Sequence, residues 1–306
     1  MKKIKALLGV SILVSSLSFG VMSCDDTDET PAAKDVVDVA LADSRFSTLT
    51  KLLTDNGLVS TLKGTGPFTV FAPTNDAFAK IDASKLTNAE LVNILKSHVI
   101  SGRVLAADVQ SGTATTLGSS IFLSKNSTGV FINGNSQVTT ADVSASNGVI
   151  HVINNVIVPP TKSLVEIAQG DPNFSELVSL VLAADASVVT ALSSASTSGL
   201  TVFAPTNAAF TELYKTIPKA TLLDPTNKAL LTSVLLYHVV PGRVFSSDLP
   251  NVSGEVGTAN PAAKLTFDLA GGAKVKGKTS GNSNITAVNI LGTNGVVHVI
   301  DKVLLP

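Results

Sequence analysis

One eight-residue segment occurs twice in this chain, first as Phe68-Thr-Val-Phe-Ala-Pro-Thr-Asn75 and again, further along, as Leu200-Thr-Val-Phe-Ala-Pro-Thr-Asn207. Three other segments return in the same order: residues 35–40 as 163–168, residues 97–104 as 237–244, and residues 147–153 as 294–300. The separation between the two copies of a segment only increases from the first of these pairs to the last. The sequence is therefore built from two copies of one unit that differ by insertions.

Helical signals come early in each copy. Thr87-Asn-Ala-Glu90 has the pattern of a capping box, and apolar residues follow it at the spacing of one helix face. This face consists of Leu91, Ile94, Leu95 and His98 in the first copy and of Leu231, Val234, Leu235 and His238 in the second. Upstream, residues 68–71 predict a strand that stops at Pro73, and Asn75 or Asn207 is expected to cap the short helix that follows.

Short strands are expected after the helices, at residues 121–124, 130–133 and 149–158. The pairs Asn147-Gly148 and Asn294-Gly295 favour type I′ hairpin turns, because both central positions of that turn need a positive φ. Helices come first and strands after them, without the strand–helix alternation of a doubly wound sheet. The sequence therefore predicts an α+β fold.

The first 24 residues have the features of an export signal. Lys2, Lys3 and Lys5 precede an apolar run at residues 6–14, and the stretch ends at Cys24, the only cysteine of the chain. A cysteine directly after a small residue resembles a bacterial lipoprotein signal, which implies removal of residues 1–23 and a lipid on Cys24. An uncleaved membrane anchor is the alternative, because residues 6–22 nearly reach the length that spans a bilayer.

Four acidic residues and no basic residue occupy positions 25–30. Such a run is typical of a solvated tether, which we expect over residues 24–33. It also resembles the surface-export signal of Bacteroidetes lipoproteins, which implies an outer-membrane lipoprotein of the cell envelope that is exposed on the surface. An aspartate directly after the cysteine, as at Asp25, is instead a signal for inner-membrane retention in enteric bacteria. The sequence therefore leaves both the outer-membrane and the inner-membrane location open.

The repeated segments also carry a family resemblance. Each copy has a Thr-Val-Phe-Ala-Pro-Thr-Asn segment, a His-Val-x-x-Gly-Arg-Val segment and an Asn-Gly-Val-x-His-Val-Ile segment, in that order. Together they resemble the fasciclin-like domain, with one domain expected at residues 34–159 and a second at 160–306. The resemblance implies a wedge of β-strands with packed helices, and adhesion or matrix contact rather than catalysis.

All four histidines lie at repeat-equivalent positions inside apolar patterns: His98, His151, His238 and His298. We interpret them as packed, hydrogen-bonded core residues rather than as ligands or bases. No histidine lies within four residues of another, and a single cysteine excludes a cysteine-built metal site. The sequence therefore predicts no catalytic residue, metal or cofactor, and a hydrolase with a site assembled from distant segments is the alternative.

One residue pair is a candidate for contact with a partner. A Tyr-His pair is linked to adhesion in some members of the resembled family, and here it matches only at Tyr237-His238, because Ser97 replaces the tyrosine in the first copy. The resemblance therefore implies partner contact by Tyr237 and His238. Tyr237 lies one position off the apolar helix face, where it could instead pack at the edge.

Composition narrows the class of partner. The 22 basic and 23 acidic residues give no positive field, so nucleic acid is not expected. The predicted function is a non-enzymatic adhesion protein that contacts an extracellular protein or polysaccharide and meets the membrane only through its lipid. A glycan-capture component of a polysaccharide-uptake system is a further alternative, disfavoured because the chain has no Trp and two Tyr for stacking on sugars.

Overall fold

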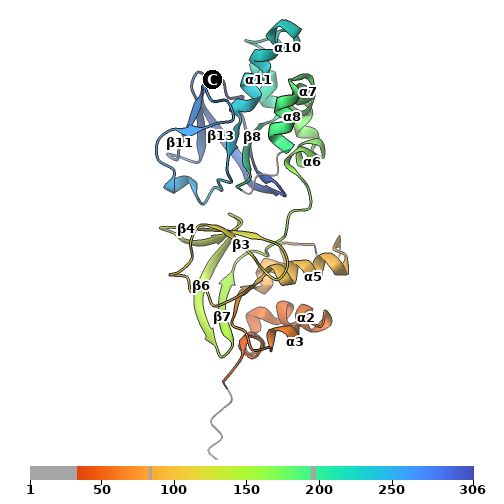
Figure 1. Ribbon diagram of the computed structural model, residues 1–306, viewed down its shortest axis with the longest axis vertical. Helices are drawn as coiled ribbons and strands as arrows, with labels where there is room; N and C mark the ends of the chain where they lie inside the picture. The colour runs from red at the N-terminus through yellow and green to blue at the C-terminus, as the bar shows by residue number, and fades with distance from the viewer. Residues whose placement is uncertain (1–32, 83–84, 194–197) are drawn as a thin grey trace, which may run out of the picture. The chain divides into compact units, whose positions relative to one another are not determined.

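The computed structural model describes residues 33–82, 85–193 and 198–306. The predicted signal peptide, Cys24 and all but the last residue of the predicted tether lie outside the described residues. Residues 34–306 form one compact unit. It has two halves with nearly the same order of elements, which we call the first half (36–153) and the second half (164–300) (Figure 1).

The first half has a seven-stranded sheet in the order β2-β1-β7-β6-β5-β4-β3. Its helices are α1 (Val36–Leu41), α2 (Ser47–Asp55), α3 (Val59–Leu62), α4 (Asn75–Phe78) and α5 (Asn88–Ser97), with the 3-10 turn η1 (Ser44–Phe46). Its strands are β1 (Phe68–Pro73), β2 (Val99–Ser101), β3 (Gly112–Ala114), β4 (Ile121–Asn126), β5 (Gly129–Ile132), β6 (Ser136–Ala145) and β7 (Gly148–Ile153). Strands β1 and β7 are parallel, with Val70 opposite Ile150, and the other pairs are antiparallel.

The second half repeats this sheet in the order β10-β11-β12-β13-β14-β8-β9. Its helices are α6 (Leu164–Gln169), α7 (Ser175–Ala183), α8 (Ala186–Ser193), α9 (Asn207–Leu213), α10 (Lys219–Leu223) and α11 (Lys228–Tyr237), with 3-10 turns η3 (Pro172–Phe174), η4 (Pro225–Asn227) and η5 (Leu249–Asn251). Its strands are β8 (Leu200–Pro205), β9 (Val239–Pro241), β10 (Val256–Gly257), β11 (Lys264–Asp268), β12 (Lys274–Gly277), β13 (Gly281–Gly292) and β14 (Gly295–Ile300). Here β8 and β14 form the parallel pair.

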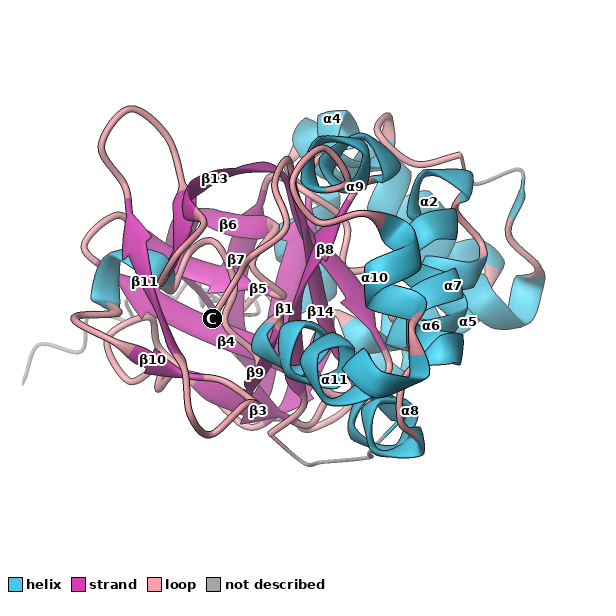
Figure 2. Ribbon diagram, turned by 90° about the horizontal axis from the view of Figure 1, so that it is seen from above, coloured by secondary structure: helices cyan, strands magenta, loops and turns pink. Residues whose placement is uncertain are grey.

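Each half has two hydrophobic cores, one on either face of its central strands. Along β1, Val70 and Ala72 pack in the core under the helices, whereas Phe71 points to the opposite face and packs with residues of β4 and β5. The helices of each half lie on one side of its sheet (Figure 2). The α+β prediction is confirmed. The described residues of all four cores lie within 34–306, which is also one compact unit, so we expect this segment to fold by itself.

The last predicted strand is shorter than expected. The pattern predicts residues 149–158, but β7 ends at Ile153. Its pairing with β1 ends at Pro73, and its regular pairing with β6 ends at the Val138–Ile153 pair. Asn154 still exchanges hydrogen bonds with Gln137 of β6, but its side-chain Oδ1 takes the place of a main-chain acceptor in one of them. The apolar side chain of Ile157 is still buried, because it packs in the core that contains Phe71, and its N–H donates to the ring of His98 instead of to a strand.

The two Asn-Gly pairs do not form type I′ turns, because neither residue of either pair has a positive φ. Asn147 instead ties the hairpin to the helices: its Oδ1 accepts from Val36 N–H at 2.9 Å and its Nδ2 donates to Leu62 O at 2.8 Å. Gly148 lies where β7 approaches β1, and a Cβ there would collide with the main chain of Phe68. Asn294 and Gly295 repeat both roles in the second half.

The predicted helix caps at Asn75 and Asn207 are also wrong, by one residue. The cap of α4 is Thr74, whose Oγ1 accepts from Ala77 N–H, and Thr206 does the same for α9. The Asn75 side chain reaches α2 instead, where its Oδ1 accepts from Thr48 N–H at 3.0 Å. Asn207 makes the equivalent bond to Glu176 N–H. The repeated Pro-Thr-Asn segment therefore caps one helix and fixes a second helix against it.

Candidate functional site

The two helix-end histidines are buried and use both ring nitrogens. His98 is 1 % exposed; its Nδ1 donates to Ile94 O at 2.7 Å, and its Nε2 accepts from Ile157 N–H at 3.0 Å. Because Nε2 accepts a hydrogen bond, the ring proton lies on Nδ1. His238 repeats the arrangement, with Val234 O at 2.8 Å and Leu304 N–H at 2.9 Å. Each ring therefore joins the end of a helix to the chain segment that follows the last strand.

The two strand histidines also use both nitrogens, with the roles exchanged. His151 accepts from Asp142 N–H at Nδ1 and donates from Nε2 to Val104 O at 2.9 Å. His298 does the same with Asn289 N–H and Val244 O. Asp142 and Asn289 have positive φ values of 60° and 59°, so each ring supports a bend in the long neighbouring strand. The core interpretation of all four histidines is confirmed.

Burial also favours the neutral form of three of these rings. It lowers the pKa of His98 and of His238 from 6.5 to about 4, and it lowers the pKa of His298 as well. A neutral ring whose two nitrogens are both engaged has no free lone pair for a metal ion and no free position to take a proton from a substrate. Among the described residues, no group of three or more His, Cys, Asp or Glu side chains is placed to hold a metal ion.

The candidate partner residues Tyr237 and His238 both lie inside the second half. Tyr237 is 0 % exposed, and its hydroxyl donates to Lys264 O at 2.7 Å and accepts from Lys278 N–H at 3.0 Å. Its phenol thus joins α11 to β11 and to the turn after β12. The structure gives both residues a packing role, and contact with a partner through them stays a prediction that would require this end of α11 to open.

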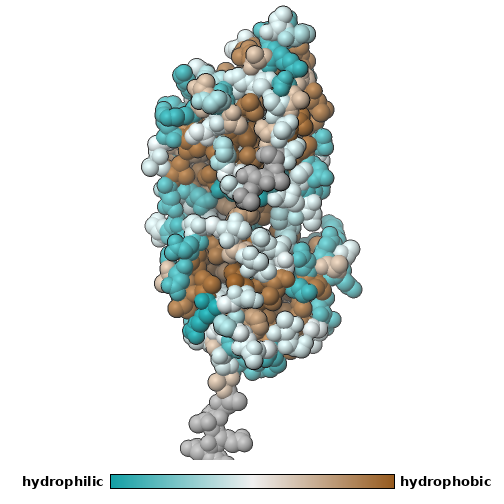
Figure 3. All heavy atoms as spheres, in the orientation of Figure 1, coloured by the Kyte–Doolittle hydropathy of each residue, from teal (hydrophilic) through white to brown (hydrophobic). Residues whose placement is uncertain are grey.

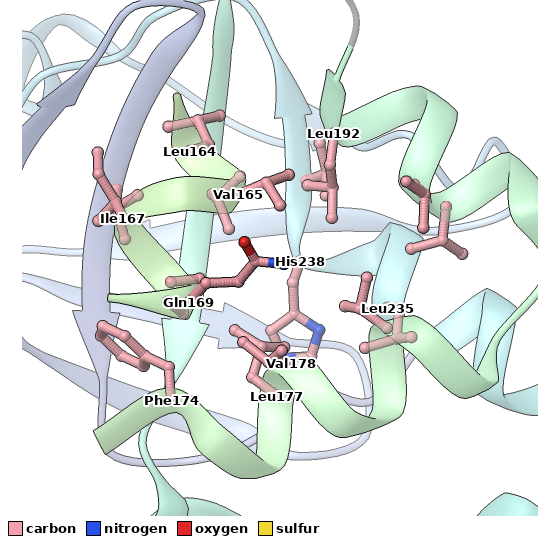
Figure 4. A pocket seen from close by; sticks show the side chains of 18 of the residues that line it. Leu164, Val165, Ile167, Gln169, Phe174, Leu177, Val178, Leu192, Leu235 and His238 are labelled. Atoms are coloured by element: carbon pink, nitrogen blue, oxygen red, sulfur yellow. The ribbon is translucent and has the colours of Figure 1, made fainter. Parts of the chain in front are cut away.

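A different feature has the character of a binding site. A cavity of ≈ 120 Å³ lies between α6, α7, α8 and the sheet of the second half. Figure 4 shows Leu164, Val165 and Ile167 of α6 and Leu177 and Val178 of α7 around it. Among the described residues that line it there is no Asp, Glu, Lys or Arg, and the polar side chains are Gln169 and the neutral His238.

This cavity was not predicted from the sequence, although the sequence contains a signal for it. Residues 175–183 read Ser-Glu-Leu-Val-Ser-Leu-Val-Leu-Ala, which places apolar residues on both faces of the helix. A helix that is apolar all round is buried or has an apolar partner. Comparison with the copy, residues 47–55, strengthens the signal, because that helix carries Lys51 and Asp55 on its outer face.

The fasciclin domain model matches the chain twice, over residues 44–159 and 172–306. The chain belongs to the fasciclin domain family. Its two fasciclin domains agree with the two halves of the structure, each with a sheet, a helical layer and two cores. Fasciclin domains take part in cell adhesion and in binding.

Relatives of this fasciclin protein occur in bacteria and in animals. Protein sll1483 of Synechocystis sp. is 44% identical over 138 residues, which are 43% of this chain and 77% of that protein. Human periostin is 30% identical over 281 residues, which are 90% of this chain but only 31% of periostin. A solved FAS1 domain pair from the insect cell adhesion molecule fasciclin I has a TM-score of 0.44 and 19% identity, and the match covers 86% of this chain and 97% of that one.

In the part of the fasciclin chain that the structure describes, none of the helices has both the length and the apolar character to cross a membrane.

Proposed function

We propose that this protein is a lipid-anchored adhesion protein of the cell envelope, whose two fasciclin domains contact an extracellular protein or polysaccharide. The observation that carries the proposal is the pair of complete fasciclin domains in one chain. Their four histidines serve the cores, so the residues that remain for contact are those of the outer faces. Binding by broad outer faces is the mode that suits domains whose histidines are already engaged.

The N-terminal sequence supports the anchor. Three lysines, an apolar run and a small residue before Cys24 have the order of a lipoprotein signal. Lipid on Cys24 would leave residues 25–33 as a tether between the membrane and the compact unit that begins at residue 34. More than one acyl chain is needed for stable anchoring, because a single chain binds a membrane only marginally.

The two alternative functions receive less support. For glycan capture, the two tyrosines are already engaged: Tyr237 is fully buried, and Tyr214 donates its hydroxyl to Glu176 Oε2 at 2.7 Å. Stacking on a sugar would then depend on phenylalanine. For a hydrolase, the four histidines are lost as general bases, because every ring nitrogen already has a main-chain partner.

Two experiments on the full chain test the lipid anchor and the cellular location. Metabolic labelling with radioactive palmitate should label the wild type and not the Cys24→Ala variant. Protease added to intact cells should then degrade the wild type if the protein is displayed outside. An Asp25→Ser variant serves as the matched control for the inner-membrane alternative, because it removes the retention signal and keeps Cys24.

Adhesion itself needs a third measurement. Purified residues 34–306, incubated with intact cells and with extracted extracellular matrix, should be retained by at least one of them above an unrelated protein of equal size. Retention by neither would contradict the adhesion proposal. Label on Cys24→Ala would contradict the anchor, and a wild type that resists protease unless Asp25 is replaced would place the protein in the inner membrane.

A further inference from the structure

The two halves differ most in their helical layers. When Phe46 is aligned with Phe174, α7 is the copy of α2, yet Thr50, Lys51, Thr54 and Asp55 of α2 correspond to Val178, Ser179, Leu182 and Ala183 of α7. In α2 the outer face carries the ion pair Lys51–Asp55, with 2.7 Å between Nζ and Oδ2. The outer face of α7 has lost both charges, and its Leu182 is 69 % exposed.

The same layer is closed in the first half and open in the second. Val37, Ala40 and Leu53 are buried at 5 % exposure or less. Their copies Val165, Ala168 and Val181 are partly exposed, and all three line the cavity.

The spacing of the helices explains the difference. Leu62 and Leu192 correspond, because each accepts a hydrogen bond from the Nδ2 of the repeated asparagine, Asn147 or Asn294. The segment from Phe174 to Leu192 is two residues longer than its copy, which runs from Phe46 to Leu62. The extra length places the eight-residue α8 where the first half has the four-residue α3.

We propose that this cavity is a binding site for the end of an uncharged hydrocarbon chain. An apolar cavity of this size stays dry and takes up apolar molecules: an engineered cavity of about 150 Å³ lined by Leu, Ile and Phe binds benzene. Here the lining is Leu, Val, Ile, Ala and Phe apart from Gln169 and His238, with no charged side chain among the described residues to pair with an ionic group. Charged or strongly polar ligands would lose hydration without compensation in such a site.

The surroundings of the cavity favour a chain over a compact ring. Two apolar side chains at its rim are exposed, Leu182 at 69 % and Val189 at 38 %. Figure 3 shows hydrophobic residues at the surface on the right edge of the second half, over α7 and α8. A chain whose end fills the cavity would continue outward over these residues, and Gln169 at the end of α6 offers an amide to a polar head group.

The test is a fluorescence titration of purified residues 34–306 with cis-parinaric acid, a long-chain polyene fatty acid whose emission rises in apolar surroundings. Saturable binding of one probe per protein is expected, with displacement by 1-dodecanol. Filling the cavity by Val178→Phe should weaken binding about tenfold or more, because the added ring takes the space of the chain. The control Thr190→Phe adds a ring of the same kind on α8, outside the lining, and should change affinity less than about twofold.

A second variant keeps the test decisive if Val178→Phe does not fold. The double substitution Val178→Thr and Leu182→Thr introduces the residues that the first half carries at Thr50 and Thr54, which the same fold accommodates. It should weaken the probe about fivefold while leaving the circular dichroism spectrum unchanged. Absence of saturable binding to the wild type would overturn the proposal. Equal binding to the wild type and to both cavity variants would show adsorption elsewhere and would overturn it too.

Discussion

His98 and His238 show how a titratable residue becomes part of a core. Each ring satisfies two main-chain groups, one on its own helix and one on the segment after the last strand, and neither bond needs a charge. A protonated ring would lose the acceptor that Ile157 N–H or Leu304 N–H requires. The unfolded chain has no such restriction, so folding and protonation of these residues oppose each other.

Stability should therefore fall as the pH drops below 6.5. The folded pKa of both residues is about 4 and the unfolded value is 6.5, so the unfolded state binds more protons between these limits. The stabilisation is complete above pH 6.5 and is lost as the pH falls towards 4. From pH 7.5 to 5.5 the two residues together should remove roughly 2–3 kcal/mol from the free energy of unfolding, which urea denaturation at the two pH values measures. Proton NMR signals of both rings that titrate near pH 6.5 in the folded protein would contradict this expectation.

Gly148 is required by a contact between strands rather than by a turn. A Cβ there would collide with the main chain of Phe68, which the parallel pairing of β1 and β7 holds in place. Gly148→Ala should therefore destabilise the protein by about 1–3 kcal/mol. Gly257→Ala in β10 is the matched control, because a Cβ at that position meets no atom within 4 Å, and its cost should be near zero. Equal melting temperatures for the two variants would disprove the contact argument.

The role of the Asn-Gly pair could not be predicted from the sequence, because it depends on residues far away in the chain. Its composition suits a type I′ turn, and that inference uses only the two residues themselves. In the structure Asn147 binds Val36 N–H, far away in the chain, and Gly148 accommodates the main chain of Phe68 on another strand. Such partners become visible only once the chain is folded, although the exact recurrence of the pair in both copies indicates that it has a fixed role.

At the scale of elements, a local signal was reliable where the whole motif lies within a few residues. The capping box at Thr87 forms as predicted: its Oγ1 accepts from Glu90 N–H, and Glu90 Oε2 accepts from Thr87 N–H at 2.8 Å. Both partners lie within four residues, so the sequence contains the whole motif. The ten-residue strand β6 was not predicted, because its conformation depends on a residue outside the strand. Its alternation is interrupted by two irregularities, one of them around Asp142, which the ring of His151 supports from the neighbouring strand.

The Thr-Asn pair before α4 offers a test of how helices are fixed to one another. Thr74 makes one capping bond, whereas Asn75 accepts from Thr48 N–H and donates to Ser44 O and to Ser47 Oγ. Asn75→Ala should therefore cost about 2 kcal/mol, more than the roughly 1 kcal/mol expected for Thr74→Ala. Urea denaturation of both variants decides the order. If Thr74→Ala proves the more damaging, Asn75 contributes little to the docking of α2 against α4.

At the scale of the whole molecule, the two copies preserve one scaffold and differ in their surfaces. The asparagine ties, the buried histidines and the parallel central strands recur in both halves, so the repeat correctly predicted two copies of one fold. The cavity between α6, α7 and α8 arises where the copies diverge, through a two-residue insertion and several substitutions on α7. The repeat predicts the structural features that both halves share, whereas the cavity lies in a region where the two halves differ.

The net charge of each half predicts how adhesion depends on salt. Residues 34–159 hold nine basic and nine acidic residues, and residues 160–306 hold ten of each, so both halves are neutral. Neither can attract a charged partner over a distance, and any binding must come from short-range contact between outer faces. Retention of residues 34–306 on its cellular or matrix partner should therefore change less than about twofold between roughly 50 and 500 mM salt, whereas a protein held by many phosphate contacts loses about a thousandfold or more over a smaller range. A steep loss with salt would show that clustered charges, and not the neutral faces, make the contact.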